Sequence, residues 1–324
     1  MMLKGVRGLS KLGIILVAAN LLVSCGGGTT SKAAHSADDT IGKEQTVKQD
    51  TLAKGKLLTR LKDSAKQQVD TVGLVKVKKD SVLRVVKAEK RRVKDSVRQE
   101  LDKLPKHIFF TFDDGPLRGS AAIDSIAKAK NINISVFLIG KHANMSKGLK
   151  RDYQRYYNNP LVECYNHSYT HANNKFTTFY SNPVAAFADF EKNEKDLQLK
   201  HKIIRLPGRN ISMYDDVRRI DLQSGVSTAD LLFADGYKIY GWDVEWKIHG
   251  LTGKPLQSVG EIYNRIRNYM NNKSSMEPNN VILLMHDDMF QNKKGQDLLS
   301  ALIDTIQRNT DYKFEFMRNY PFRY

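Results

Sequence analysis

Two adjacent carboxylates, Asp113 and Asp114, stand on a Gly-Pro turn directly after an apolar stretch, in the segment HIFFTFDDGPLRGS at 107–120. A turn needs only one Asp, so the second one indicates chemistry. Two imidazoles, His167 and His171, lie four residues apart, and one helical turn would place them on the same face. Two histidines and a carboxylate with open positions for water form a ligand set of catalytic zinc or iron.

The doubled Asp suggests a division of labour. Neighbouring side chains point in different directions where a chain leaves a strand. One carboxylate can therefore bind the metal while the other faces the bound water.

Short apolar runs alternate with longer amphipathic ones from residue 107 onward. This alternation predicts parallel strands joined by helices. The expected strands are 108–112, 135–139, 161–164, 203–205, 238–242, 281–285 and 312–316. The expected helices are 120–130, 184–199, 215–223, 258–272 and 296–309. Seven such units predict an α/β fold, a distorted (β/α)7 barrel, with an open doubly wound sheet as the alternative.

Chemically versatile side chains follow the expected strands. In a parallel barrel the carboxyl ends of the strands share one face, where active sites are assembled. We therefore expect convergence of Asp113, Asp114, His167, Arg205, Asp243, Glu245 and His286.

Five segments, in this order, resemble the motifs of the NodB-type polysaccharide deacetylases, carbohydrate esterase family 4. They are TFDDGP at 111–116, HSYTH at 167–171, RLP at 205–207, WDVEW at 242–246 and LMHD at 284–287. The first two together are highly specific, and the other three support them. The resemblance implies a distorted (β/α)7 barrel in which Asp114, His167 and His171 bind a divalent metal, usually zinc, with cobalt or nickel as alternatives.

The same resemblance implies roles for the remaining motif residues. Asp113 would be the general base, oriented by Arg205, and His286 the general acid. The backbone N–H of Gly208 would stabilise the oxyanion, and Trp246 would lie at the substrate.

Two motifs depart from the family pattern. Glu245 stands where the family usually has an Asp that tethers the catalytic histidine, so either Glu245 or Asp243 is expected to hold His286. In the third motif, Gly208 follows the proline directly and Arg209 takes the later place. Backbone donation survives this change, whereas Arg209 could crowd the substrate or recognise an acidic sugar.

Residues 1–24 are predicted to be a lipoprotein signal peptide. A basic start and the run LGIILVAANLLV precede the tetrapeptide LVSC, which resembles a lipobox and makes Cys25 the acylated residue. An ordinary secretory signal is the alternative. Residues 25–42 are expected to be a flexible tether. The chain is then lipid-anchored in the bacterial cell envelope, facing the periplasm or on the cell surface. Only Cys164 is left, so no intramolecular disulfide can form.

Residues 43–104 are predicted to be a basic helical stalk, with a coiled coil as one form of it. Residues 43–106 hold 19 Lys and Arg against 9 Asp and Glu, while all 29 aromatics lie at or after Phe109. The net charge of +17 thus has its main source beside the expected anchor, and export argues against a nucleic-acid partner. Binding of the stalk to an anionic wall polymer is the alternative. The oligomeric state stays open.

Residues 105–324 are the expected catalytic domain. The favoured function is a metal-dependent hydrolase that removes N-acetyl groups from N-acetylglucosamine-containing polysaccharide, with peptidoglycan as the favoured polymer. The alternatives are a carbohydrate O-acetyl esterase with the same metal site, a catalytically silent carbohydrate-binding lipoprotein, and an adhesin or envelope tether that depends on the stalk.

Overall fold

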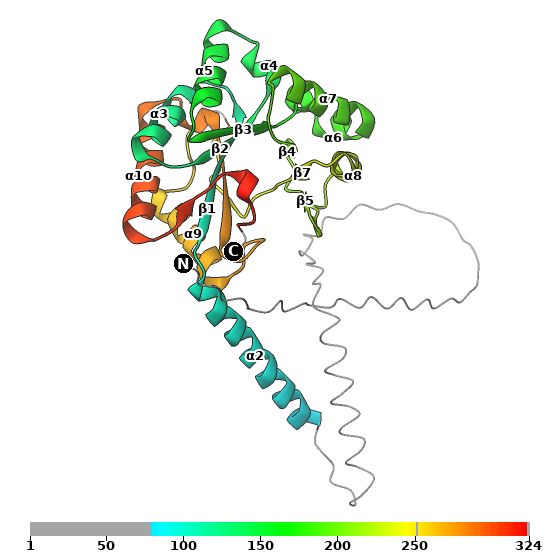
Figure 1. The fold of residues 1–324 in the computed structure, drawn as a ribbon, viewed down its shortest axis with the longest axis vertical. Coiled ribbons are helices and arrows are strands. Elements are labelled where there is room, and N and C mark those ends of the chain that lie inside the picture. Colours follow the sequence, from blue (N-terminus) through cyan, green and yellow to red (C-terminus); the bar gives the residue numbers. More distant parts are fainter. Residues whose placement is uncertain (1–78, 251, 323–324) are drawn as a thin grey trace, which may run out of the picture. The chain divides into compact units, whose positions relative to one another are not determined.

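The structure, a computed structural model, describes residues 79–250 and 252–322 (Figure 1). The expected signal peptide, Cys25, the tether and the first part of the stalk lie outside the described residues. Within the described part of the chain, no helix has the length and apolar character needed to cross a membrane.

Seven parallel strands form the frame of the domain. They are β1 (His107–Gly115), β2 (Ile134–Leu138), β3 (Val162–Asn166), β4 (Ile203–Ile204), β7 (Lys238–Ile239), β8 (Val244–Glu245) and β9 (Asn280–His286). Their order across the sheet is β8-β9-β1-β2-β3-β4-β7, so β1 lies between β2 and β9. The sheet does not close between β7 and β8. The prediction of a distorted (β/α)7 barrel is confirmed.

Three further strands extend this frame. β5 (Ser212–Tyr214) and β6 (Val217–Arg219) form an antiparallel hairpin, and β5 pairs with β7. The prediction of a helix over 215–223 is wrong, because Asp215 adopts a left-handed φ of 47° and turns the chain into this hairpin. β10 (Lys313–Phe314) pairs with the start of β1. The last expected strand is therefore not the seventh of the barrel, a place that β8 takes.

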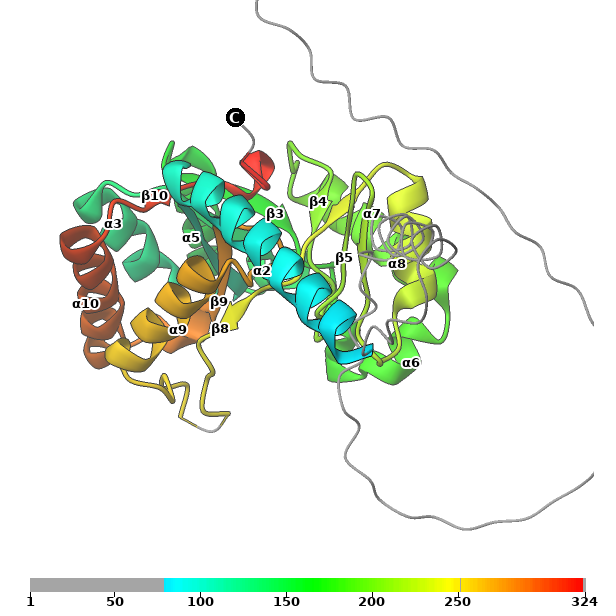
Figure 2. The ribbon, with the colours of Figure 1, turned by 90° about the horizontal axis from the view of Figure 1, so that it is seen from below.

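Helices surround the sheet in two groups. α3 (Ser120–Lys130), α9 (Val259–Asn272) and α10 (Lys293–Asn309) gather beside β1 and β9, whereas α7 (Pro183–Asp196) and α8 (Val226–Ala234) lie near β4 and β5 (Figure 2). The others are α4 (Gly140–Ala143), α5 (Lys147–Asn158), α6 (Phe176–Tyr180), η1 (His171–Asn174), η2 (Asp287–Phe290) and η3 (Met317–Asn319). Side-chain caps begin several of them: Ser146 caps α5, Asn182 caps α7, and Ser258 with Glu261 forms a capping box on α9.

Alternation along β1 explains why Thr111 and Asp113 face the barrel interior. Ile108, Phe110 and Phe112 pack in the large outer core with the helices, whereas Phe109 belongs to a separate cluster with residues of β2, β3 and β9. Successive side chains of a strand point to opposite faces. Asp113 therefore lies on the same face as Phe109, inside the barrel.

The helix α2 (Lys79–Lys103) precedes β1 and belongs to the same structural unit. Its C-terminal end is attached to the domain by an ion pair of Asp102 with Lys273 at 2.7 Å and by a hydrogen bond from Asn279 to the carbonyl of Leu101 at 2.6 Å. Val93 and Val97 are exposed. This helix covers the last part of the expected stalk, whose role stays a prediction.

Candidate active site

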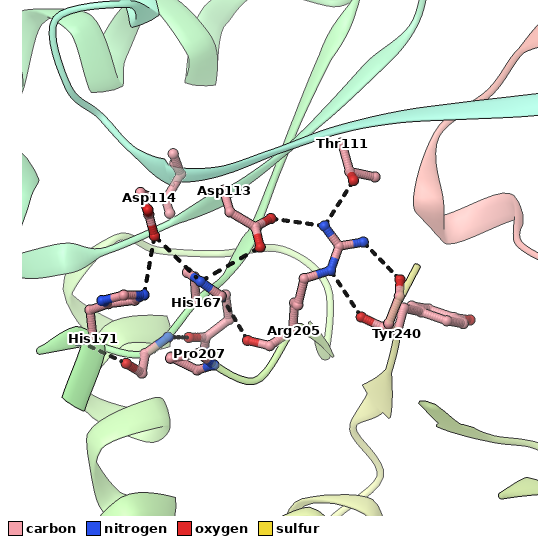
Figure 3. A network of polar contacts seen from close by, with 12 residues as sticks. Thr111, Asp113, Asp114, His167, His171, Arg205, Pro207 and Tyr240 are labelled. Atoms are coloured by element: carbon pink, nitrogen blue, oxygen red, sulfur yellow. Dashed lines mark hydrogen bonds and ion pairs between the residues drawn. The ribbon is translucent and has the colours of Figure 1, made fainter. Parts of the chain in front are cut away.

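Asp113 and Arg205 form a buried ion pair inside the barrel. The Nη1 atom of Arg205 donates to Asp113 Oδ1 and to Thr111 Oγ1, both at 2.8 Å (Figure 3). Its other nitrogens donate to the carbonyls of Tyr240 and Gly241 at 3.0 Å. The guanidinium is therefore fixed on three sides, and it holds one carboxylate oxygen of Asp113 while the other faces the predicted metal ligands.

Asp114 occupies an irregular turn of the backbone. Its φ is 72°, and the register between β1 and β2 shifts between Asp113 and Gly115. His142 Nδ1 lies 2.7 Å from the backbone carbonyl of Asp114 and, as the donor, holds this turn in place. No sequence pattern assigned His142 a role, because the contact depends on how α4 follows β2.

The two histidines of the second motif converge on Asp114. The distance from Asp114 Oδ1 to His171 Nε2 is 3.2 Å, and to His167 Nε2 it is 3.5 Å (Figure 3). The expected helical turn between them is wrong. His167 follows the end of β3, Ser168 has a φ of 63°, and His171 has a φ of 51°. A loop with left-handed residues, and no α-helix, brings the two rings together.

Hydrogen bonds on the far sides of the rings define their protonation. His167 Nδ1 lies 2.8 Å from the carbonyl of Arg205, and His171 Nδ1 lies 3.0 Å from Asn174 Oδ1. The carbonyl oxygen of Arg205 and the amide oxygen of Asn174 are acceptors. Nδ1 therefore carries the hydrogen in each neutral ring, and Nε2 presents a lone pair. Burial lowers the pKa of His167 to about 4, which keeps this ring neutral at pH 7.

Three lone-pair atoms thus face one another, and this arrangement fits a cation. Asp114 Oδ1 is buried and has no hydrogen-bond partner in the described part of the chain. Burial alone would raise the pKa of Asp114, but the imidazoles of His171, His167, His286 and His142 together outweigh it and lower the pKa. Zinc ligands about 2.1 Å from the ion are separated by about 3.4 Å in a tetrahedron, close to the two distances from Asp114 Oδ1 to the imidazoles.

A pocket of about 280 Å³ opens in front of these ligands. The lining residues are Asp113, Asp114, His167, His171, Gly208, Trp242, Glu245, Leu284 and His286. Gly208 has a φ of 65°, a conformation that glycine adopts without strain, and its Cα faces the ring of Phe176. The structure therefore gathers residues of all five motifs around one hollow at the carboxyl ends of the strands.

The expected tether of His286 is absent from the described residues. His286 Nδ1 is buried and has no hydrogen-bond partner there. Asp243 uses both carboxylate oxygens elsewhere, accepting from the backbone N–H groups of Met276 at 2.7 Å and Ile282 at 2.9 Å. Burial raises the pKa of Asp243 to about 6. Asp243 as the tether is wrong, whereas Glu245 lines the same pocket as His286 and its role stays a prediction.

Trp246 is not at the substrate pocket. Its side chain is 0% exposed, packs against Phe290 and donates from Nε1 to the carbonyl of Gln257 at 2.9 Å. The prediction that Trp246 contacts the substrate is wrong, because its strand position faces the outer core. Trp242, from the same motif, lines the pocket instead.

Arg209 is also turned away from the substrate. Its guanidinium donates to the Ser224 carbonyl and Oγ, to the Gly208 carbonyl and to Gln223. It also lies over the rings of Phe176 and Tyr180. These contacts fasten the segment that follows the β5–β6 hairpin, so neither crowding nor recognition of a sugar by Arg209 is supported.

A buried carboxylate beside the expected acid was not identified from the sequence. Asp287, 1% exposed, accepts from the Gly119 N–H at 2.9 Å and from the hydroxyls of Ser120 at 2.5 Å and Tyr156 at 3.1 Å. Burial raises the pKa of Asp287 to about 7. It joins the end of β9 to the loop that follows Asp113 and Asp114.

Comparison with known families agrees with this site. Residues 100–226 match the sequence model of the polysaccharide deacetylase family. This match agrees with the motifs and indicates a hydrolase of the polysaccharide deacetylase type. No curated protein matches the chain.

Several solved structures are similar to this chain. A carbohydrate esterase family 4 enzyme from Streptococcus mutans shares 17% identity over 67% of this chain and 89% of its own, with a TM-score of 0.48. The catalytic domain of a peptidoglycan N-acetylglucosamine deacetylase from Eubacterium rectale shares 20% over 65% and 89%, with a TM-score of 0.46. A polysaccharide deacetylase from Bacillus cereus shares 20% over 65% and 91%, with a TM-score of 0.45.

Proposed function

We propose that the protein is a metal-dependent deacetylase that removes N-acetyl groups from N-acetylglucosamine-containing polysaccharide, with peptidoglycan as the preferred polymer. The observation that carries the proposal is the convergence of Asp114 Oδ1 and two histidine Nε2 atoms beside the free oxygen of Asp113. All three ligand atoms lie within 4.8 Å of one another. The preference for peptidoglycan rests on the expected anchoring in the cell envelope.

The cation would be held by Asp114, His167 and His171, and zinc suits this donor set. When bound, it would lower the pKa of a coordinated water and polarise the acetyl carbonyl. The hydrogen bonds from the Nδ1 atoms orient both rings for such binding.

Asp113 would act as the general base. Its Oδ2 atom lies 3.6 Å from His167 Nε2, at the edge of the ligand cluster, while Arg205 holds Oδ1. Oδ2 is thus available to take a proton from an attacking water. The Gly208 N–H would donate to the developing oxyanion, and His286, which lines the same pocket, would protonate the departing nitrogen.

A carbohydrate O-acetyl esterase is the second candidate, favoured by one observation. His286 Nδ1 has no partner among the described residues, so the acid lacks the support that a poor leaving group needs. An alkoxide leaves more easily than an amine. An esterase therefore depends less on the position of His286.

One experiment tests both candidates. The purified protein is stripped of metal with a chelator, reloaded with zinc or cobalt, and assayed on acetylated chito-oligosaccharides, peptidoglycan fragments and acetylated xylan. We expect metal-dependent release of acetate from the first two, and a loss of about 10²–10⁴-fold in His286→Ala. Ester turnover retained in this variant without amide turnover in the wild type indicates the esterase. Inactivity on every substrate with metal present favours a silent carbohydrate-binding protein.

The envelope location is part of the proposal. Acylation at Cys25 would hold the enzyme at a membrane beside its polymer. In a bacterial host, the full chain should fractionate with membranes, and Cys25→Ser should move it to the soluble fraction. Membrane fractionation that Cys25→Ser leaves unchanged would rule out the lipid anchor.

A further inference from the structure

The loop that carries both metal-binding histidines has no free backbone N–H from residue 167 to residue 171. The first N–H donates to the carbonyl of Leu138 at 3.0 Å. The second donates to Asn166 Oδ1 at 2.9 Å, the third and fourth share Asp189 Oδ2 at 2.9 and 3.0 Å, and the fifth donates to Ser168 Oγ at 3.0 Å. Four of the five N–H groups donate to side-chain atoms, and the third also lies 3.3 Å from the backbone carbonyl of Asp189, so the path of this loop is defined mainly by side chains.

The path is one that the backbone does not adopt by itself. Ser168 and His171 have φ values of 63° and 51°. Such conformations in residues other than glycine cost about 1–3 kcal/mol and persist only where the surroundings enforce them. The hydrogen-bond acceptors around the loop hold these two residues in their left-handed conformation.

Two side chains that hold the loop in place come from one face of α7. Asp189 and Asn193 lie four residues apart and therefore on the same face of the helix. Asp189 binds the loop directly, through the N–H groups of Tyr169 and Thr170. Ala186 and Phe190, both buried, fix the helix against the domain.

Asn193 holds the loop indirectly, by binding atoms that in turn accept from the loop. It is 0% exposed and uses its whole amide: Nδ2 donates to the Leu138 carbonyl at 2.8 Å and to Asn166 Oδ1 at 2.7 Å, and Oδ1 accepts from the Gly140 N–H at 2.7 Å. The first two of these acceptors are the same atoms that receive the N–H groups of His167 and Ser168. Asn193 therefore locks the start of the loop to the end of β2.

We infer that Asp189 and Asn193 are positioning residues that shape the metal site before the ion binds. They hold the loop so that the His167 and His171 Nε2 atoms already face Asp114 Oδ1. Without them, the loop would relax its left-handed residues and separate the two rings, and the ion would have to order it again on binding. This inference rests on the metal site of the proposed function.

The test is the affinity for Zn²⁺, measured on the metal-free protein by competition with a chromogenic chelator. Asp189→Ala should weaken binding by about 10–100-fold, as losses of groups that orient metal ligands do. Asp189→Asn keeps an oxygen acceptor at the same place and should bind within about threefold of the wild type. The matched control is Glu191→Ala, which removes a carboxylate from the same helix that the loop does not use.

Two further measurements separate positioning from general destabilisation. Thermal unfolding of the metal-free variants shows whether each one folds, and Asp189→Ser, a polar side chain too short to bridge to the loop, replaces Asp189→Ala if the latter does not. The visible absorption of the Co²⁺-loaded protein reports ligand geometry, and it should change in Asp189→Ala and in Asn193→Ala but not in Glu191→Ala.

The outcomes distinguish the inference from the proposed function. A wild-type protein that binds no Zn²⁺ overturns both. A wild-type protein that binds Zn²⁺, with folded Asp189→Ala and Asn193→Ala variants of equal affinity and unchanged Co²⁺ spectra, overturns the inference alone.

Discussion

The two halves of the pocket differ in how firmly their residues are held. In the half that contains the expected base and metal ligands, the His167 and His171 Nδ1 atoms and one oxygen of Asp113 each have a hydrogen-bond partner at 2.8–3.0 Å. In the half that contains the expected acid, His286 Nδ1 is buried with no partner among the described residues. Activation of water is thus supported by a rigid frame, and protonation of the leaving group is not.

The difference coincides with the departure from the family motif. Glu245 replaces the usual Asp next to the tryptophan, and Asp243 is occupied by two backbone N–H groups. A longer side chain reaches further but is held less firmly, since it has one more rotatable bond. The residues around the expected metal are therefore fixed, whereas the predicted support of His286 is a side chain that can move.

Asp113→Asn tests the rigid half, and we expect the largest effect from it. The amide oxygen can still accept from Arg205, so the fold and the metal ligands should be retained, but the amide cannot take a proton from water. The kcat should fall by about 10²–10⁴-fold. The measurement is steady-state turnover together with the zinc content of the variant. Near-normal turnover at full zinc content would assign the base to another residue and remove the basis of the comparison.

Asp287 connects the two halves, and its titration should affect stability. Its pKa is raised from 3.8 to about 7 by burial, so between about pH 4 and pH 7 the folded state holds a proton that the unfolded state has lost. The free energy of unfolding should therefore fall as pH rises through this window and level off above it, by up to about 4 kcal/mol.

Denaturant unfolding of Asp287→Asn at several pH values checks this. The amide can accept from the Gly119 N–H and donate to Ser120 and Tyr156, so this variant should lack that part of the decline. Asp287→Ala is the contrast, because it leaves three donors unpaired at about 1–3 kcal/mol each. If the free energy of unfolding of Asp287→Asn falls with pH as much as that of the wild type, another group causes the fall.

The sequence predicted the frame of the site well. The strands that became β1, β2 and β9 were located to within a few residues, because central strands buried on both faces are long apolar runs. The motif residues lie at the ends of such strands, so their convergence followed from the parallel topology alone. The short edge elements were harder: β8 has two residues, too few to show any pattern.

Features that depend on distant partners could not be predicted. The path from His167 to His171 is set by Asp189 and Asn193, which come from a helix about 20 residues further along, and no local pattern connects them. Trp246 faces the outer core, where its Nε1 donates to the carbonyl of Gln257, a partner from the following segment. Spacing favoured a helical turn in the first case, and the family resemblance favoured a substrate contact in the second.

Glu245→Gln probes the less supported half, with a moderate effect expected. If Glu245 moves onto His286 Nδ1 when substrate is bound, the kcat for N-acetyl substrates should fall about tenfold, a fraction of what a general acid supplies. Asp243→Asn is the matched variant: it should lower stability, because one backbone N–H loses its acceptor, and leave kcat unchanged. A larger loss of kcat in Asp243→Asn than in Glu245→Gln would reverse the assignment and show that the buried carboxylate serves the acid.

The smallest effect is expected from the two tryptophans of the fourth motif, of which Trp242 lines the pocket and Trp246 is buried in the outer core. Trp242→Ala should raise KM by about 3- to 10-fold with little change in kcat, since an aromatic contact contributes about 0.5–1.5 kcal/mol. Trp246→Phe should leave KM unchanged and lower the free energy of unfolding by about 1 kcal/mol, because Gln257 loses its donor. Steady-state kinetics and denaturant unfolding of both variants measure these changes in KM, kcat and the free energy of unfolding. A raised KM in Trp246→Phe alone would mean that the wall moves on substrate binding and brings the buried indole into contact, so the acid half would be mobile beyond the side chain of Glu245.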